Sequence, residues 1–138
     1  MKGRQTYSIK IAAPIKRVFD VITNPEFTPK WVVNVVHETR DYPLKVGTVF
    51  KDRLRNGDRV EMTVDMLKSP ALLRLTDGEF HEKYRLHAVD KKSTLIHITE
   101  WEGEKTLVYG GLREKLIALK KFIEQNKKFI AQECKKTK

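Results

Sequence analysis

The residues best placed for chemistry in this sequence are carboxylates that interrupt apolar faces. Asp52 lies between Phe50 and Leu54 in a run where apolar and polar residues alternate. Glu82 lies two positions before Tyr84, and so on the same face of its strand. A carboxylate on a dry face must be paired, hydrogen-bonded or protonated, because burial disfavours its charged form. We therefore expect Glu82 to face the interior with a raised pKa, and to serve as an acid, a base or a polar anchor beside the Tyr84 hydroxyl.

A second glutamate can lie beside Glu82. If a three-residue turn joins Val89 to Ser93, antiparallel pairing places Glu82 opposite Glu100. These two glutamates are the candidate catalytic residues. Asp52 is expected about three strands from Glu82, or ~14 Å away, which is too far for a tight acid pair. The alternative is that both glutamates lie at the end of the sheet, in water or near the positive start of the last helix.

The histidines and the single cysteine predict neither a metal site nor a thiol site. His81 and His87 share the polar face of one segment and His37 lies elsewhere, so surface positions are expected. Cys134 lies near the C-terminal end and has no second cysteine with which to form a disulfide. The segment around His97 can face either way, with either His97, Thr99 and Trp101 or Ile96, Ile98 and Glu100 inward. No metal and no cofactor are expected.

The elements that must position these residues are mostly strands. The clearest pair is residues 50–55 and 60–66, whose apolar and polar residues alternate on either side of the turn Asn56-Gly57-Asp58. Further strands are expected at 7–11, 70–75, 80–88 and 95–101. Consecutive strands joined by short turns predict an antiparallel meander.

Helical periodicity occurs near both ends of the chain. Pro14 suits the first turn of a short helix, and a second short helix is expected at 26–31. After Gly111 the apolar residues recur at helical spacing, at Leu112, Leu116, Leu119, Ile123 and Ile130. This pattern predicts one helix of more than about twenty residues that packs against the sheet.

Composition and charge restrict the class of protein. Hydrophobic residues make up 40% of the chain and charged residues 33%, which is typical of a globular protein, and one domain over residues 1–138 is expected. No apolar run is long enough to cross a bilayer and no secretory signal is recognised, so a cytoplasmic location is expected. Residues 112–138 hold nine Lys and Arg against three Glu, a net of +6 out of +10. This basic helix is expected to contact anionic membrane surfaces weakly, and no nucleic-acid partner is expected because no such motif accompanies it.

The order of the expected elements is that of the helix-grip fold. The opening block, residues 7–26 (YSIKIAAPIKRVFDVITNPE) followed by Trp31, resembles the start of the SRPBCC superfamily, which includes START lipid-transfer domains, Bet v 1-like proteins and polyketide cyclases. The resemblance implies an α+β helix-grip fold. In it, a curved antiparallel sheet of about seven strands, two short N-terminal helices and a long C-terminal helix enclose an apolar cavity. It implies no reaction, because no catalytic motif of the superfamily carries over to residues of this chain.

Three function hypotheses follow. The first is binding of a small apolar or amphipathic molecule, such as a lipid, quinone or polyketide, in the cavity. Its expected lining is Phe50, Asp52, Val60, Met62, Val64, Phe80, Glu82, Tyr84, Leu86, Leu116, Leu119 and Ile123. An empty void of ~300 Å³ would cost several kcal/mol, so a hollow fold indicates a guest or water. The alternative is an interior filled by methionine and aromatic side chains. The second hypothesis is a cyclase or dehydratase that uses Glu82, and the third is a protein or membrane interaction module.

Overall fold

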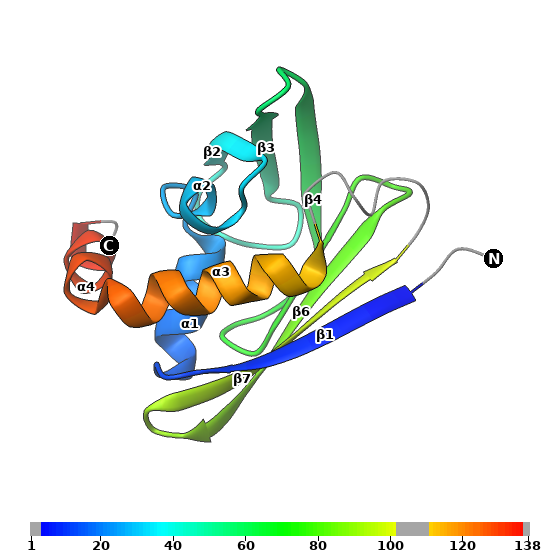
Figure 1. Ribbon diagram of the computed structural model, residues 1–138. Helices are drawn as coiled ribbons and strands as arrows, with labels where there is room; N and C mark the ends of the chain where they lie inside the picture. Colours follow the sequence, from blue (N-terminus) through cyan, green and yellow to red (C-terminus); the bar gives the residue numbers. More distant parts are fainter. Residues whose placement is uncertain (1–3, 102–110, 137–138) are drawn as a thin grey trace.

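The protein is described by a computed structural model that covers residues 4–101 and 111–136 (Figure 1). Its strands are β1 (Arg4–Ile11), β2 (Val35–Arg40), β3 (Val49–Leu54), β4 (Arg59–Lys68), β5 (Leu72–Thr76), β6 (His81–Asp90) and β7 (Ser93–Trp101). They form a seven-stranded antiparallel sheet in the order β1-β7-β6-β5-β4-β3-β2. Strands β2 to β7 make the predicted meander, and β1 completes the sheet by pairing with β7.

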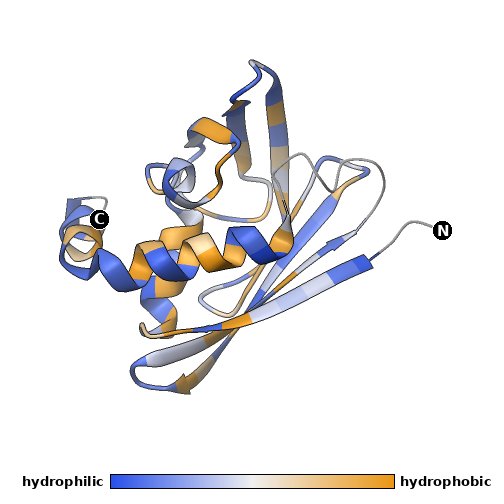
Figure 2. Cartoon of the chain, viewed as in Figure 1, coloured by the Kyte–Doolittle hydropathy of each residue, from blue (hydrophilic) through white to orange (hydrophobic). Residues whose placement is uncertain are grey.

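The helices are α1 (Ile15–Thr23), α2 (Thr28–Trp31), α3 (Leu112–Gln125) and α4 (Lys127–Lys136). Helix α3 lies across the concave side of the curled sheet, which is the predicted helix-grip arrangement (Figure 1). In Figure 2 hydrophobic residues alternate with hydrophilic ones along α3, as expected for a helix with one buried face. Within residues 4–101 and 111–136, no helix is long and apolar enough to span a membrane.

The C-terminal helical pattern divides into two helices. Asn126, between α3 and α4, has φ −132° and ψ 34°, and its side-chain amide donates to the Phe122 carbonyl at 2.9 Å. An asparagine that bonds the backbone of the preceding turn competes with helix continuation, which explains the break. The buried stripe nevertheless continues into α4 through Ile130 and Cys134, so Cys134 packs in the core rather than at a frayed end.

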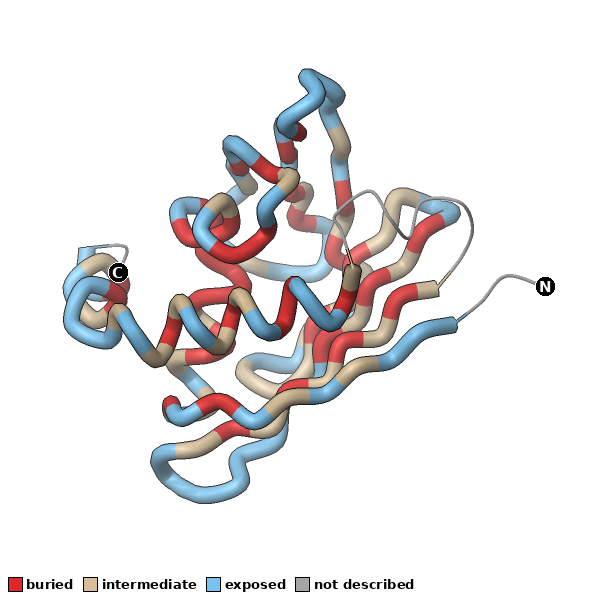
Figure 3. Tube along the Cα trace, viewed as in Figure 1, coloured by how far each residue is buried: buried red, intermediate tan, exposed pale blue. Residues whose placement is uncertain are grey.

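The predicted facing of the strands is largely confirmed. In β3, Phe50, Asp52 and Leu54 are buried, and Gly57 takes the positive φ of +94° that the following turn requires. In β7 the alternative with Ile96, Ile98 and Glu100 inward is correct. Buried residues alternate with exposed or intermediate ones along β3, β5, β7 and the first half of β6, and Figure 3 shows this alternation in the sheet. This alternation separates a dry inner face from an outer face in water.

The β6–β7 register is the predicted one, although its turn is tighter. Asp90 pairs with Ser93, and a register shift follows Ala88, so the expected three-residue turn is replaced by a shorter turn and a bulge. Glu82 still lies directly opposite Glu100. The core therefore holds two glutamates side by side on the inner face of the sheet.

Candidate functional site

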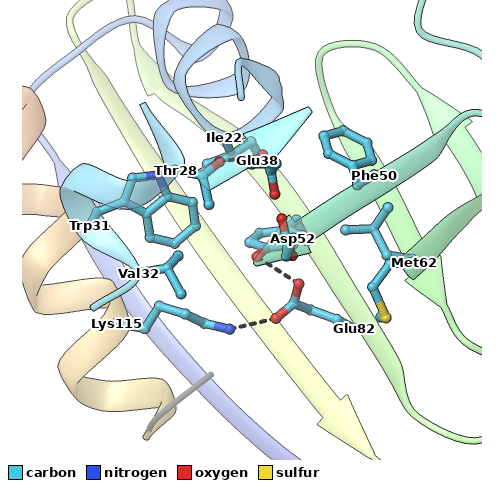
Figure 4. Close-up of a pocket in the computed structure, with 12 residues that line it drawn as sticks. Ile22, Thr28, Trp31, Val32, Glu38, Phe50, Asp52, Met62, Glu82 and Lys115 are labelled. Carbon is cyan, nitrogen blue, oxygen red and sulfur yellow. Dashed lines mark hydrogen bonds and ion pairs between the residues drawn. The ribbon is translucent and has the colours of Figure 1, made fainter. Parts of the chain in front are cut away.

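A small cavity lies between the sheet and helices α1, α2 and α3 (Figure 4). Its wall consists of Ile22, Thr28, Trp31, Val32, Glu38, Phe50, Asp52, Met62, Leu75, Glu82, Tyr84 and Lys115. Its volume is about 30 Å³, room for roughly one or two water molecules. This volume is well below the ~300 Å³ expected for a ligand chamber, and Phe50, Met62, Phe80 and Tyr84, four of the five side chains of the filled-interior alternative, are buried. Met66, the other proposed filler, is 39% exposed.

One lysine organises the polar part of this site. Lys115 lies in the first turn of α3, where its backbone N–H donates to the Gly111 carbonyl. Its Nζ donates to Glu82 Oε2 at 2.5 Å and to Glu100 Oε2 at 2.6 Å, and all three side chains are buried. Burial alone would lower the pKa of Lys115, but the charges of Glu82 and Glu100 raise it above its ordinary value. The lysine is therefore a permanent cation in the core.

The two glutamates beside Lys115 differ in protonation. Burial favours the neutral form of Glu82, but its pKa is lowered by Lys115, by a hydrogen bond from Glu100 and by the Tyr84 hydroxyl, whose Oη donates at 2.8 Å. Burial and the charge of Glu82 raise the pKa of Glu100 to about 8. At neutral pH one proton and one negative charge are thus shared across the pair, and Lys115 balances the charge.

These contacts correct the expected ionisation of Glu82. Its pKa is lowered rather than raised, because Lys115 donates to it, and Glu100 carries the raised pKa instead. Of the alternative positions, the one in water is excluded, since Glu82 is 5% exposed and Glu100 1% exposed. The one near the start of the last helix agrees with the bonds of both glutamates to Lys115, in the first turn of α3.

A second carboxyl pair forms on the other side of the cavity. Glu38 of β2 lies directly opposite Asp52 of β3, and the Thr28 hydroxyl donates to Glu38 Oε1 at 2.5 Å. Burial, a hydrogen bond with Asp52 and the charge of Asp52 raise the pKa of Glu38 well above its ordinary value. Glu38 therefore holds the proton that lies between these two carboxyls.

The curl of the sheet brings the two carboxyl pairs to one cavity. Asp52 and Glu82 lie on strands three positions apart, as predicted, yet both line the same space (Figure 4). The charge of Glu82 also contributes to the raised pKa of Glu38. A flat-sheet spacing of ~14 Å does not take this curvature into account.

The opposite wall of the cavity is aromatic and apolar. Trp31 meets Tyr84 edge to face, with ring centroids 6.5 Å apart and an interplanar angle of 82°. The Trp31 Nε1 donor is buried and has no hydrogen-bond partner among the residues that the structure describes. A buried donor without an acceptor costs free energy, and Trp31, a residue of the cavity wall, carries this cost.

The structure separates the predicted lining residues into two groups. Five of them line the cavity, namely Phe50, Asp52, Met62, Glu82 and Tyr84. The others are away from it: Val64, Phe80, Leu86, Leu116, Leu119 and Ile123 are buried in the core, and Val60 is half-buried against it. Glu100 lies behind the wall and reaches the site through Glu82 and Lys115.

The sequence reasoning missed Glu38, Lys115 and Trp31. A signal for Lys115 was available, because it follows Leu112 by three positions and precedes Leu119 by four, which places it on the apolar stripe of α3. Glu38 gave no comparable signal, since a register shift between Val35 and His37 breaks the alternation of β2.

The carboxyl-rich cavity does not have the arrangement of a metal site. Within residues 4–101 and 111–136, no group of three or more His, Cys, Asp or Glu side chains is placed so that it could hold a metal ion. The carboxylates are instead engaged by the lysine ammonium, by hydroxyl groups and by one another.

Comparison with known proteins gives structural neighbours only. Neither a protein-family model nor a curated protein sequence matches the chain. A protein from Nitrosomonas europaea superposes with a TM-score of 0.72 at 15% identity, covering 90% of this chain and 96% of its own. A polyketide cyclase-like protein from Corynebacterium glutamicum gives 0.66 at 16% identity, covering 94% and 96%. A norcoclaurine synthase from Thalictrum flavum gives 0.63 at 13% identity, covering 92% and 97%.

These likenesses, at identities of 13 to 16%, bear on the fold alone. They agree with the seven-stranded curled sheet that grips α3 and with the opening block of the sequence. The chain has the helix-grip fold of the SRPBCC superfamily, the fold of Bet v 1-like and polyketide cyclase-like proteins.

Proposed function

We propose that this protein binds a small amphipathic molecule in the cavity between the sheet and α3. The polar group of the ligand would contact the carboxyl groups of Glu38, Asp52 and Glu82. Its apolar part would lie against Trp31, Val32, Phe50 and Met62, the apolar portion of the same wall. Two structural neighbours of known type support a ligand-binding use of the fold: a polyketide cyclase-like protein, and a norcoclaurine synthase variant in complex with a transition-state analogue.

The observation that carries the proposal is the concentration of ionisable groups in the core. Glu38, Asp52, Glu82, Glu100 and Lys115 are each at most 9% exposed. Desolvating charged groups costs several kcal/mol each, and well-packed apolar residues in their place are often equally or more stable. Strongly shifted pKa values beside a cavity are typical of functional sites. A binding role accounts for this cost.

The chemistry of the wall restricts the polar group of the ligand. Carboxylates accept hydrogen bonds, whereas the Trp31 Nε1 can only donate one. A hydroxyl group can satisfy both, and an amine matches the carboxylates, while a ligand carboxylate would be repelled by Glu82 and Asp52. We therefore expect alcohols, phenols or amines rather than fatty acids.

The size of the cavity indicates that binding requires movement. About 30 Å³ is well below the several hundred Å³ that enclose a drug-sized ligand. Met62, which lines the cavity, is an unbranched and flexible side chain that can change rotamer at low cost. Binding should therefore widen the site around Met62 and Trp31 rather than fill a preformed chamber.

A second candidate function is acid–base catalysis of the cyclase or dehydratase type. It is favoured by the separation of the two glutamate pKa values, with that of Glu82 lowered and that of Glu100 raised to about 8. Glu82 on the cavity wall would then be the base that touches the substrate. Glu100, behind it, would be a positioning residue that controls the proton on Glu82.

Native mass spectrometry of freshly purified protein tests the binding proposal. We expect a species heavier than the 16.1 kDa chain, and solvent extraction should release an alcohol, phenol or amine. An Asp52→Asn variant should retain less of it, while the surface variant Lys16→Gln should retain as much as the parent protein. If the chain carries no guest and no neutral or amine probe raises its melting temperature, the proposal fails.

A further inference from the structure

The outer face of β1, β6 and β7 carries cations and hydroxyl groups but no carboxylates. Pairing places Thr6 opposite Thr99 and Thr99 opposite Lys83, and the next outward row is Ser8, His97 and Arg85. Acidic residues occur at three positions of these strands: Glu82 and Glu100 face inward, and Asp90 lies at the hairpin turn. The positive charges of this face therefore have no counter-ions on their own strands.

A hollow of about 320 Å³ opens on this face of the sheet. It is lined by Thr6, Lys83, Arg85, His87, His97 and Thr99. The hydroxyl groups of its two threonines, Thr6 and Thr99, bond each other at 3.0 Å. Lys83 and Arg85 make no ion pair within residues 4–101 and 111–136, so both cations remain available to a guest.

The two histidines of the hollow contact each other, and His97 also contacts Ser8. The His97 Nδ1 and the Ser8 Oγ are 2.5 Å apart, and the His97 ring meets that of His87 edge to face at 5.4 Å. Burial, and then the charges of His87 and Arg85, lower the pKa of His97. The charged groups around His97 therefore make the hollow positive, and a bound anion would relieve the repulsion between them.

We infer that this hollow binds the phosphate group of a phosphorylated molecule. Lys83 and Arg85 supply two positive charges, and the threonine hydroxyls and the imidazoles of the same lining supply donors. Guanidinium and ammonium groups beside hydroxyls match the several acceptor oxygens of a phosphate better than the two of a carboxylate. The site lies on the opposite face of the sheet from the carboxyl-rich cavity, so it does not depend on the proposed function of that cavity.

Amide NMR during titration with inorganic phosphate tests this site, with sodium chloride at matched ionic strength as the reference. We expect saturable shifts for residues around Thr6, Lys83 and Thr99, beyond those that chloride causes. Arg85→Gln should weaken phosphate binding about tenfold, since it removes a charged hydrogen bond. Lys83→Gln, at a second position of the hollow, should weaken binding in the same direction.

The matched control is Arg53→Gln, which removes the same charge from an exposed position of β3, three strands from β6 in the sheet. It should change phosphate binding less than about twofold, because salt screens distant surface charges. The inference is overturned if chloride causes the same shifts, or if Arg53→Gln weakens binding as much as Arg85→Gln.

Two further probes identify the source of the phosphate. Glycerol phosphate represents a soluble ester, and vesicles of phosphatidylcholine with phosphatidic acid represent a lipid headgroup. Sedimentation with these vesicles that depends on Arg85 would assign the site to a lipid phosphate. Binding of glycerol phosphate without such sedimentation would assign it to a soluble one.

Discussion

The two faces of the sheet place their charged side chains in opposite environments. On the inner face, Glu82 and Glu100 are almost fully buried and depend on a single lysine from α3. On the outer face, Lys83 and Arg85 occupy the alternating positions of the same strand β6 and face water. The side-chain period of two in a strand therefore separates a desolvated cluster from a solvated one within a single hairpin.

This difference determines how much each charge matters to stability. A pair of charges 4 Å apart is worth about 1 kcal/mol in water but several kcal/mol in a partly buried environment. Ions on the inner face cannot use water as an alternative partner, so removing one leaves the other uncompensated.

Replacing Lys115 should have the largest effect on stability. Lys115→Met removes the cation between Glu82 and Glu100, and we expect a loss of about 3 to 5 kcal/mol in the free energy of unfolding. Denaturant titration measures this loss. The matched control is Lys16→Met, which breaks an exposed pair with Asp20 and should cost less than about 0.5 kcal/mol. Equal losses in the two variants would show that the inner cluster is no more than a surface ion pair.

Glu100 should make the protein less stable as the pH rises. Its folded pKa of about 8 lies above the unfolded value of ~4.3, so the folded state binds a proton more tightly in that interval. Stability is therefore lost progressively from about pH 4 towards pH 8. Glu38, whose pKa is also raised, contributes in the same direction. Glu82 has a lowered pKa, so its contribution to stability is lost only as the pH falls below the pKa that it has in the unfolded chain.

Glu100→Gln isolates this contribution, because the amide can donate to Glu82 as the protonated carboxyl does. At pH 8 the variant should be more stable than the parent protein by about 1 to 3 kcal/mol, with little difference near pH 4. Thermal unfolding of both proteins across this range provides the measurement. Parallel stability curves would mean that Glu100 does not take up a proton on folding.

Removing residues 135–138 should have the smallest effect. Lys135 and Lys136 are exposed, and the contact of Lys136 with Glu133 is a surface ion pair, so truncation after Cys134 should cost less than about 0.5 kcal/mol. Ile130→Ala, at a fully buried position of α4, should cost about 2 to 5 kcal/mol by comparison. A large loss on truncation would place part of the docking surface of α4 in its last residues.

The sequence predicts those features of the inner face that depend on the alternation of apolar and polar residues along a strand. Glu82 was predicted to face inward because it lies two positions before Tyr84 and so on the same face of the strand. Its pairing with Glu100 is retained although the turn is shorter, because a register shift of one residue would turn the apolar side chains outward. The sequence does not determine the facing of β7, since Ile96 and His97 each belong to a plausible alternating set, and only the packing of the folded chain decides between them.

The parts that were missed depend on long-range geometry. The curl of the sheet, which brings Asp52 and Glu82 to one cavity, has no local pattern. The pKa of Glu82 depends on Lys115, 33 positions away in the sequence. Its position on an apolar stripe was readable, but a lysine in a basic helix is ordinarily a solvated residue. Asn126 likewise splits the final helical pattern through one side-chain bond that periodicity does not detect.

The carboxyl-rich cavity is proposed to accept the polar group of an amphipathic ligand. Amide NMR with hexanol, hexylamine and hexanoate at neutral pH tests it most directly, because these probes share one chain and differ only in the head group. We expect the alcohol and the amine to shift amides around Trp31, Asp52, Met62 and Glu82, and hexanoate to leave these amides unchanged. Asp52→Asn should weaken binding of the amine. Equal shifts from hexanoate, or no shifts at these residues from any of the three probes, would contradict it.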